Sequence, residues 1–342
     1  MLCDIHSEFG LDSSKILATV TDNASNFAKA FRVFGVKLCN FQRDVDGENN
    51  EFSDTSADEE SDDENFQSIP MDPDEECALE PNKPLPQHLR CCAHTLNLCV
   101  ASDAIKAINS FPLLLSVHEQ AMAKCTVLWR FVGRPKSAEI LMDILGHTLS
   151  RPGETRWNSL YDSLRQIVKI REKCPQLSRA LNIKNTLKET DFIYIEEHLS
   201  CVAPVAEALD ILQGENNVYY GIVLPCLFAL RKKLQVLQNK ELKYCRPLSD
   251  ALLESVERRF KDFFDMSAVS AQNAAIATLS YPRFRNRWLS CIGLESAQIL
   301  SFFKKTVAAE SNCVEVSEKE TDPFDDYFDF AMESQSAACG DS

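Results

Sequence analysis

The segment KILATVTDNASNFAKAFRVF, residues 15–34, decides how the chain begins to fold. Residues 15–20 are mostly apolar and include β-branched side chains, which predicts a buried β-strand. Asp22 follows at the carboxyl end of this strand, and Asn23 is placed to cap a helix. The predicted helix carries three phenylalanines on one face: Phe27, Phe31 and Phe34. We therefore expect a strand, a polar turn and a helix, the start of an α/β arrangement.

Downstream of residue 88 the sequence predicts almost only helices. Apolar residues recur at helical spacing in a series of segments: 95–108, 113–132, 158–173, 191–214, 218–238, 247–264 and 266–280. Pro112 separates the first two, and Asp191 can cap the fourth. The predicted fold class is thus α/β plus all-α, with a short α/β part followed by a mostly helical one.

The formal net charge of -15 is unevenly distributed along the chain. Residues 41–80 hold sixteen Asp or Glu and one Arg, and residues 309–342 hold ten Asp or Glu and one Lys. The remaining chain has 34 Lys or Arg against 25 Asp or Glu, a net charge of +9. A mildly basic folded part with two acidic appendages suits a polyanionic partner, although an ordinary solvated surface has the same balance.

Composition also suggests the domain boundaries. We expect core residues at 1–40 and 88–157, a disordered acidic insertion at 41–87, a helical domain at 158–308 and a disordered acidic tail at 309–342. No apolar run approaches the length of about 18 residues that spans a bilayer, so no membrane association is expected. The fourteen cysteines show no disulfide-framework spacing, which favours reduced thiols in the cytosol or nucleus.

Asp22 is the first candidate site residue. A carboxylate at the carboxyl end of a buried strand is where two-metal phosphoryl-transfer enzymes place a metal ligand. Such a site needs roughly three acidic ligands from separate elements to hold two Mg²⁺ ions. Asp and Asn also form turns and helix caps, so the alternative for this segment is a structural role.

The second candidate motif is RCCAHTLN, residues 90–97. Cys91 and His94 have the C-x-x-H spacing of half a zinc site, but no second pair at zinc-finger spacing follows. His94 is therefore either a contact to phosphate or carboxylate, or a structural residue near a strand-to-helix junction.

The third candidate motif is TRWNSL, residues 155–160. Arg156 and Trp157 follow a turn and begin a helix, which pairs a phosphate-binding donor with a stacking surface. The alternative is that Trp157 anchors the helix to the core.

Taken in order, VTDNASN (20–26), RCCAHTLNL (90–98) and TRWNSL (155–160) resemble the hAT family of DNA transposases. The resemblance implies an incomplete ribonuclease-H-like core followed by the helical insertion domain of that family. Asp22 matches a metal-binding acid of the family's Asp-Asp-Glu triad, and Cys91 and His94 match its C-x-x-H motif. Trp157, after Arg156, matches the tryptophan that stacks on a flipped base. Three motif positions are read as structural: Cys91, Asn26 and Asn97.

The chain also departs from the family pattern. No acid upstream of residue 20 lies in the strand context of the first catalytic Asp, no Glu can be assigned to the third position, and no BED-type zinc domain precedes the core. We expect a transposon-derived, truncated and non-catalytic protein with residual DNA binding and no cofactor. Mg²⁺ would be needed only if the whole active site were present.

Two alternatives remain at this point. One is a fragment of an active transposase that cleaves and joins DNA strands with Mg²⁺, and the other is a scaffold that binds protein partners through the helical domain. The resemblance implies a nuclear location, with the cytoplasm as the alternative, and the sequence assigns no oligomeric state.

Overall fold

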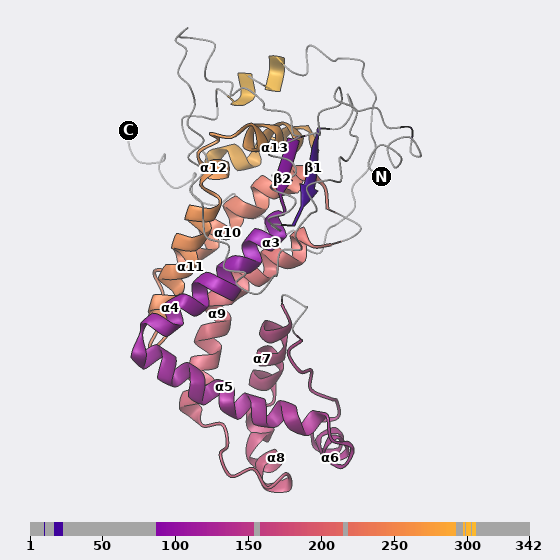
Figure 1. Ribbon diagram of the computed structural model, residues 1–342, viewed down its shortest axis with the longest axis vertical. Helices are drawn as coiled ribbons and strands as arrows, with labels where there is room; N and C mark the ends of the chain where they lie inside the picture. The colour runs from indigo at the N-terminus through magenta and orange to yellow at the C-terminus, as the bar shows by residue number, and fades with distance from the viewer. Residues whose placement is uncertain are drawn as a thin grey trace, which may run out of the picture. The chain divides into compact units, whose positions relative to one another are not determined.

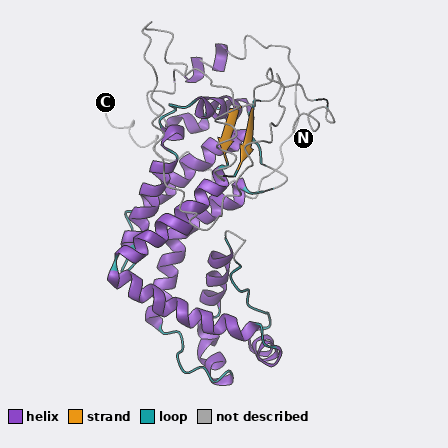
Figure 2. Ribbon diagram, in the orientation of Figure 1, coloured by secondary structure: helices purple, strands orange, loops and turns teal. Residues whose placement is uncertain are grey.

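A computed structural model describes Gly10 and residues 17–22, 87–153, 158–214, 218–291, 297, 299–301 and 303–305. Several predicted features lie outside these residues: the helix over 23–34, nearly all of the acidic insertion, and the acidic tail. The described part is mostly helical, with two strands (Figure 2). This agrees with the predicted abundance of helices.

The chain divides into two compact units. One comprises Met1–Thr95 with Ala268–Ser270, and the other comprises Leu96–Ser267 with Ala271–Ser342. Residues 96–157, which we expected to belong to the core fragment, are therefore grouped with the helices that follow them.

The first unit contains a parallel pair of short strands, β1 (Ala18–Thr21) and β2 (Gln87–Arg90). In their register Ala18 lies opposite Gln87, and Thr21 lies opposite Arg90. The sequence prediction placed Gln87 in the acidic insertion, which was wrong because this residue begins β2. The strand predicted within residues 15–20 is present as β1, but its predicted burial was wrong, since no residue of β1 is buried and Val20 is 58% exposed.

A long helix with a π-helical centre follows β2. It consists of α3 (Cys92–Leu98), η3 (Cys99–Ala104) and α4 (Ile105–Ser110). Phe111 then leaves helical geometry with φ -115° and ψ 101°, and Pro112 is the first residue of α5 (Pro112–Val132). Proline suits this position because the first helical N–H has no partner within the helix.

Short elements follow α5 in the second unit: α6 (Pro135–Leu145), α7 (Ser159–Lys169), η4 (Arg171–Lys173) and α8 (Cys174–Ala180). Gly146 ends α6 with φ 81°, the left-handed conformation that glycine adopts readily. Figure 1 shows these elements at one end of the helical unit, and α6 contacts both α5 and α8.

The central element of the second unit is α9 (Glu189–Leu212), which contacts α5, α7, α10 and α11. Buried residues lie on nearly every side of this helix, as expected for a helix surrounded by others. Asp191 caps it as the third helical residue, where its carboxylate accepts a 2.6 Å hydrogen bond from the Lys188 backbone N–H. We expected Asp191 to begin and cap this helix; the helix instead begins at Glu189 with Lys188 as its N-cap, and Asp191 supports the cap from the third helical position.

The remaining elements complete the helical part: η5 (Tyr220–Ile222), α10 (Val223–Leu237), α11 (Arg246–Arg259), α12 (Lys261–Phe264), α13 (Val269–Ser280) and η6 (Arg287–Cys291). Helices α5, α7, α9, α10, α11 and α13 occupy the segments in which helical spacing predicted them, whereas α6 and α8 were not predicted. Within the described residues no single helix is long and apolar enough to span a membrane; the segments 92–110 and 112–132 meet that criterion only jointly, across a 119° bend.

Candidate functional site

Asp22 and the first turn of α3 leave the strand pair at the same edge. Because β1 and β2 are parallel, their carboxyl ends lie together, and ligands of parallel sheets usually bind beyond these ends. The backbone N–H of Cys91 donates a 2.8 Å hydrogen bond to the carbonyl oxygen of Thr21. This bond holds the start of α3 beside the exposed Asp22.

His88 is bound to β1 through its side chain. Its Nε2 lies 2.6 Å from the Thr21 hydroxyl, which itself donates a 2.9 Å hydrogen bond to the Asp22 carbonyl oxygen. Since the hydroxyl has a single proton, His88 is the donor, through Nε2–H. Burial, with a smaller contribution from the Arg90 charge, lowers the pKa of His88 and favours this neutral form.

The C-x-x-H residues lie at the start of α3. Cys91 precedes the helix and His94 is its third residue, and both side chains are partly buried. Asn97 follows one turn later and is also partly buried. Burial raises the pKa of the neighbouring Cys92 thiol to about 12, so this sulfur stays protonated and is a poor metal ligand at neutral pH.

The strand pair thus places the exposed Asp22 beside the start of α3, with the His88 side chain on Thr21 and His94 in the first turn of the helix. Among the described residues, no three His, Cys, Asp or Glu side chains converge to hold a metal ion. The arrangement would allow Asp22 to contribute to a cation site that other acids completed.

The third predicted motif is only partly described. Arg156, Trp157 and the rest of residues 154–157 lie outside the described part of the chain, as does Asn26. The residues on either side of the gap, Gly153 and Asn158, both line a cavity of about 870 Å³. We call it the α7 cavity, because the segment 150–153, one side of α7 and the carboxyl end of α9 surround it.

Hydrogen bonds between these three elements shape the α7 cavity. The Asn158 amide donates to the Ala206 carbonyl oxygen at 2.9 Å and to the Asp210 carboxylate at 2.7 Å, which joins the start of α7 to α9. The Gln166 side chain accepts a 2.7 Å bond from the Ser150 N–H and donates a 3.1 Å bond to its hydroxyl. The walls of the cavity are therefore ordered by polar contacts.

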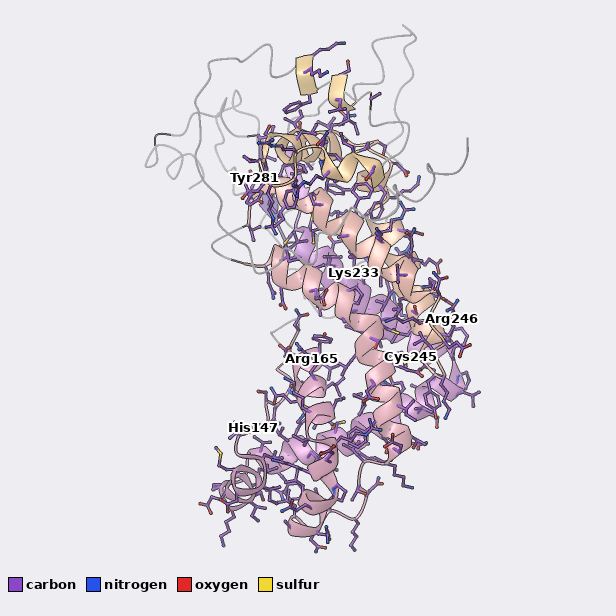
Figure 3. The ribbon with its side chains drawn as sticks, turned by 180° about the vertical axis from the view of Figure 1, so that it is seen from behind. His147, Arg165, Lys233, Cys245, Arg246 and Tyr281 are labelled. Carbon is purple, nitrogen blue, oxygen red and sulfur yellow. The ribbon has the colours of Figure 1, made fainter. Side chains whose placement is uncertain are left out.

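Three exposed cations line the α7 cavity: Arg151, Arg165 and Lys169. None of them forms an ion pair with any residue that the structure describes. Arg165 projects from α7 (labelled in Figure 3), and its guanidinium carbon lies 5.5 Å from the centre of the Tyr161 ring. That contact leaves the charge available to an anion.

These cations belong to the most basic part of the sequence. Residues 124–188 contain thirteen Lys or Arg and only five Asp or Glu. This window accounts for +8 of the net charge of +9 that remains when the two acidic stretches are set aside. The positive charge of the folded part is therefore concentrated around α5 to α8, a signal that counting along the sequence could have found.

Comparison with protein-family models, curated proteins and solved structures finds no match for this chain.

Proposed function

We propose that this chain binds nucleic acid through its helical unit without cleaving it. The observation that carries the proposal is the concentration of thirteen basic residues within 124–188, among them exposed cations without ion-pair partners in the described residues. Nucleic acids present a dense row of phosphate charges, and neutralising them releases counterions. The cations of this segment are suited to that interaction.

The order of the three motifs supports the same proposal, because it resembles a family of DNA-processing enzymes. Arg156 and Trp157 fall inside the basic segment, and they would add a phosphate donor and a stacking surface. The nucleus is the compartment that such a function implies.

The non-catalytic part of the proposal rests on the acids identified from the sequence. Asp22 is the one carboxylate that matches the family triad, and a single acid would hold two Mg²⁺ ions poorly. If the chain nevertheless cleaves DNA, cleavage of a terminal-inverted-repeat duplex should require Mg²⁺ and be abolished by Asp22→Ala. Absence of cleavage by the purified chain would exclude the enzyme alternative for this chain.

Salt-dependent binding tests the main proposal. We expect fluorescein-labelled oligothymidylate to bind the full chain, with the logarithm of the association constant falling linearly with the logarithm of NaCl concentration. Arg156→Ala and Trp157→Ala should each weaken binding, whereas Lys232→Ala, at an exposed position on α10, should not. An association constant that does not depend on salt, or that neither substitution changes, would contradict the proposal.

A protein-interaction scaffold is the second candidate function, and exposed apolar side chains on α4 and at its bend into α5 favour it. Leu113 is 86% exposed, Ile105 50% and Phe111 49%. This alternative predicts no salt-dependent DNA affinity, and a protein partner whose binding Leu113→Asp abolishes.

A further inference from the structure

A groove of about 510 Å³ lies between α9 and α10 in the helical unit. Three of its lining residues have small or compact side chains: Ala203 and Pro204 on α9, and Ala229 on α10. Val236 on α10 lines the same groove and is 53% exposed, although its side chain is apolar. This α9–α10 groove therefore offers an apolar surface to solvent.

Three lysines line the groove beside this apolar surface. Lys233 (labelled in Figure 3) forms a 2.6 Å ion pair with Glu207, which joins α10 to α9. Lys232 and Lys240 are exposed, and neither forms an ion pair with any residue that the structure describes. Val236 follows Lys232 by four residues, so the two side chains share one face of α10. With three lysines and one glutamate, the lining has a net charge of +2. An occupant that is apolar on one face and acidic on the other would match it.

The segment DPFDDYFDFAME, residues 322–333 of this chain, has that chemistry in its sequence. Apolar residues recur in it at helical spacing: Phe324, Tyr327, Phe328, Ala331 and Met332. Asp322 is placed to cap such a helix, with Pro323 as its first residue. The five acids of the segment all fall outside the apolar stripe. The sequence thus predicts an amphipathic helix whose second face is acidic.

The acidic insertion does not have this pattern. Its most acidic stretch, residues 51–65, contains one aromatic residue, Phe52. Charge complementarity alone would suit either acidic segment, but the apolar stripe distinguishes residues 322–333. Sixteen residues, 306–321, connect this segment to Lys305, which belongs to the same unit as the groove. Fully extended, they span about 55 Å, compared with about 36 Å for the whole of α9. The length of the connection therefore does not prevent the contact.

We propose that residues 322–333 bind as a short helix in the α9–α10 groove of their own chain. The apolar stripe packs on Val236, and the aspartates lie against Lys232 and Lys240. This is recognition of an amphipathic helix by an apolar groove. A helix of this length is marginal alone in water, so the segment folds as it binds. The inference goes beyond the proposed function, because the contact involves no nucleic acid.

Hydrogen–deuterium exchange of the full chain tests this contact. The amides of residues 324–333 should exchange at least about tenfold more slowly than in an isolated peptide of the same sequence, because binding protects them. Val236→Asp places an acid on the groove at an exposed position, and it should abolish the protection. Val218→Asp is the matched control, since Val218 is 42% exposed and lies outside the groove lining. Exchange as fast as in the isolated peptide would overturn the inference.

Reversing the charges tests the ionic part of the contact. Lys232→Glu combined with Lys240→Glu should release the segment, because like charges then face each other. Changing Asp325, Asp326 and Asp329 to Lys in that background should restore the protection. Rescue would also show that the lysine double variant still folds. A release that the reversed segment does not rescue would contradict the assignment of the acids to these lysines.

Sedimentation velocity distinguishes the chain's own segment from that of a second copy. Protection that is present in a monomer and independent of protein concentration supports binding within one chain. Protection that increases with concentration, together with a dimer, would place the segment in the groove of a second copy and would overturn the inference. None of these measurements contains nucleic acid, so their outcome does not depend on the proposed function.

Discussion

At the scale of single residues, polar groups buried along α9 are paired with one another. The Tyr194 hydroxyl lies 2.6 Å from His118 Nδ1 and 3.4 Å from His198 Nδ1. With both histidines neutral, the Tyr194 hydroxyl can donate to one ring and accept from the other, so it pairs with one nitrogen of each. Burial, and then the neighbouring His118, lowers the pKa of His198 to about 4, and burial also lowers that of His118.

These shifts predict a loss of stability in mild acid. The unfolded chain protonates His198 near its ordinary pKa of 6.5, whereas the folded chain resists protonation down to about pH 4. Stability is therefore complete above pH 6.5 and falls between pH 6.5 and 4, by about 3 kcal/mol from this residue. Urea unfolding across this range should show a shallower pH dependence for His198→Gln than for the wild type. His147→Gln, at an exposed position, should retain the wild-type dependence.

The buried ion pair between Lys124 and Asp191 supports a second prediction. Lys124 Nζ lies 2.8 Å and 2.6 Å from the two carboxylate oxygens, and both side chains are less than a tenth exposed. Lys124→Met should destabilise the fold by about 3 kcal/mol, because it leaves the carboxylate buried without its cation. Adding Asp191→Asn should recover part of that loss in urea unfolding. If the double variant is less stable than Lys124→Met, the unpaired charge is not the cause.

At the scale of secondary-structure elements, α13 packs closely against η5. The hydroxyl of Thr278 on α13 donates a 2.9 Å hydrogen bond to the Gly221 carbonyl oxygen. A Cβ atom added at Gly221 would lie 2.7 Å from the Ala277 carbonyl oxygen and 3.2 Å from the Thr278 nitrogen. Only glycine permits this approach without moving one of the two elements.

Gly221→Ala should therefore destabilise the fold by about 1–3 kcal/mol and lower the melting temperature. Gly133→Ala is the matched control, since a Cβ atom there meets only the Arg151 side chain and an Arg130 backbone oxygen, no closer than 3.6 Å. Its melting temperature should stay close to that of the wild type. Equal effects of the two substitutions would indicate that the lost flexibility of glycine, and not the close contact, decides the result.

The spacing of apolar residues predicted helices such as α9. It did not predict β2 or the π-helical turn η3, which depend on contacts with residues far away in the sequence. The QHLR sequence of β2 has no apolar alternation, and this strand forms beside β1 from far upstream. The π-helical turn η3 is similar, because Asp103 within it accepts hydrogen bonds from Ser255, Arg258 and Arg259 on α11. Burial alone would raise the pKa of Asp103, but the bonds from Arg259 and Ser255 lower it overall.

At the scale of the whole molecule, the candidate sites were predictable to different extents. A strand followed by an acid predicted the position of Asp22, and β2 then brought Cys91 to the same edge. The α7 cavity could not be predicted from local spacing, because its lining residues are brought together only when α7 packs against α9. For the α7 cavity, only the excess of basic residues in 124–188 can be read from the sequence alone.

Charge is also segregated along the chain, which leads to a last prediction. Residues 309–342 carry a net charge of -9, opposite in sign to the basic segment 124–188. From these charges we expect the tail to compete with nucleic acid for the cations around α5 to α8. Replacing its ten acids with Asn and Gln should tighten oligothymidylate binding at low salt by roughly three- to tenfold. The difference should vanish near 1 M NaCl, where the screening length is about 3 Å.

Anisotropy titrations at low and high salt measure this effect, and a tail of the same composition in shuffled order is the control. The shuffled tail keeps its charge, so it should bind like the wild type if competition is electrostatic. Tighter binding by the shuffled tail would instead mean that a particular tail sequence occupies the basic segment. Equal affinities of all three chains at low salt would mean that the tail does not compete. The basic segment would then be available to a polyanion at every salt concentration, and its own charge alone would set the affinity.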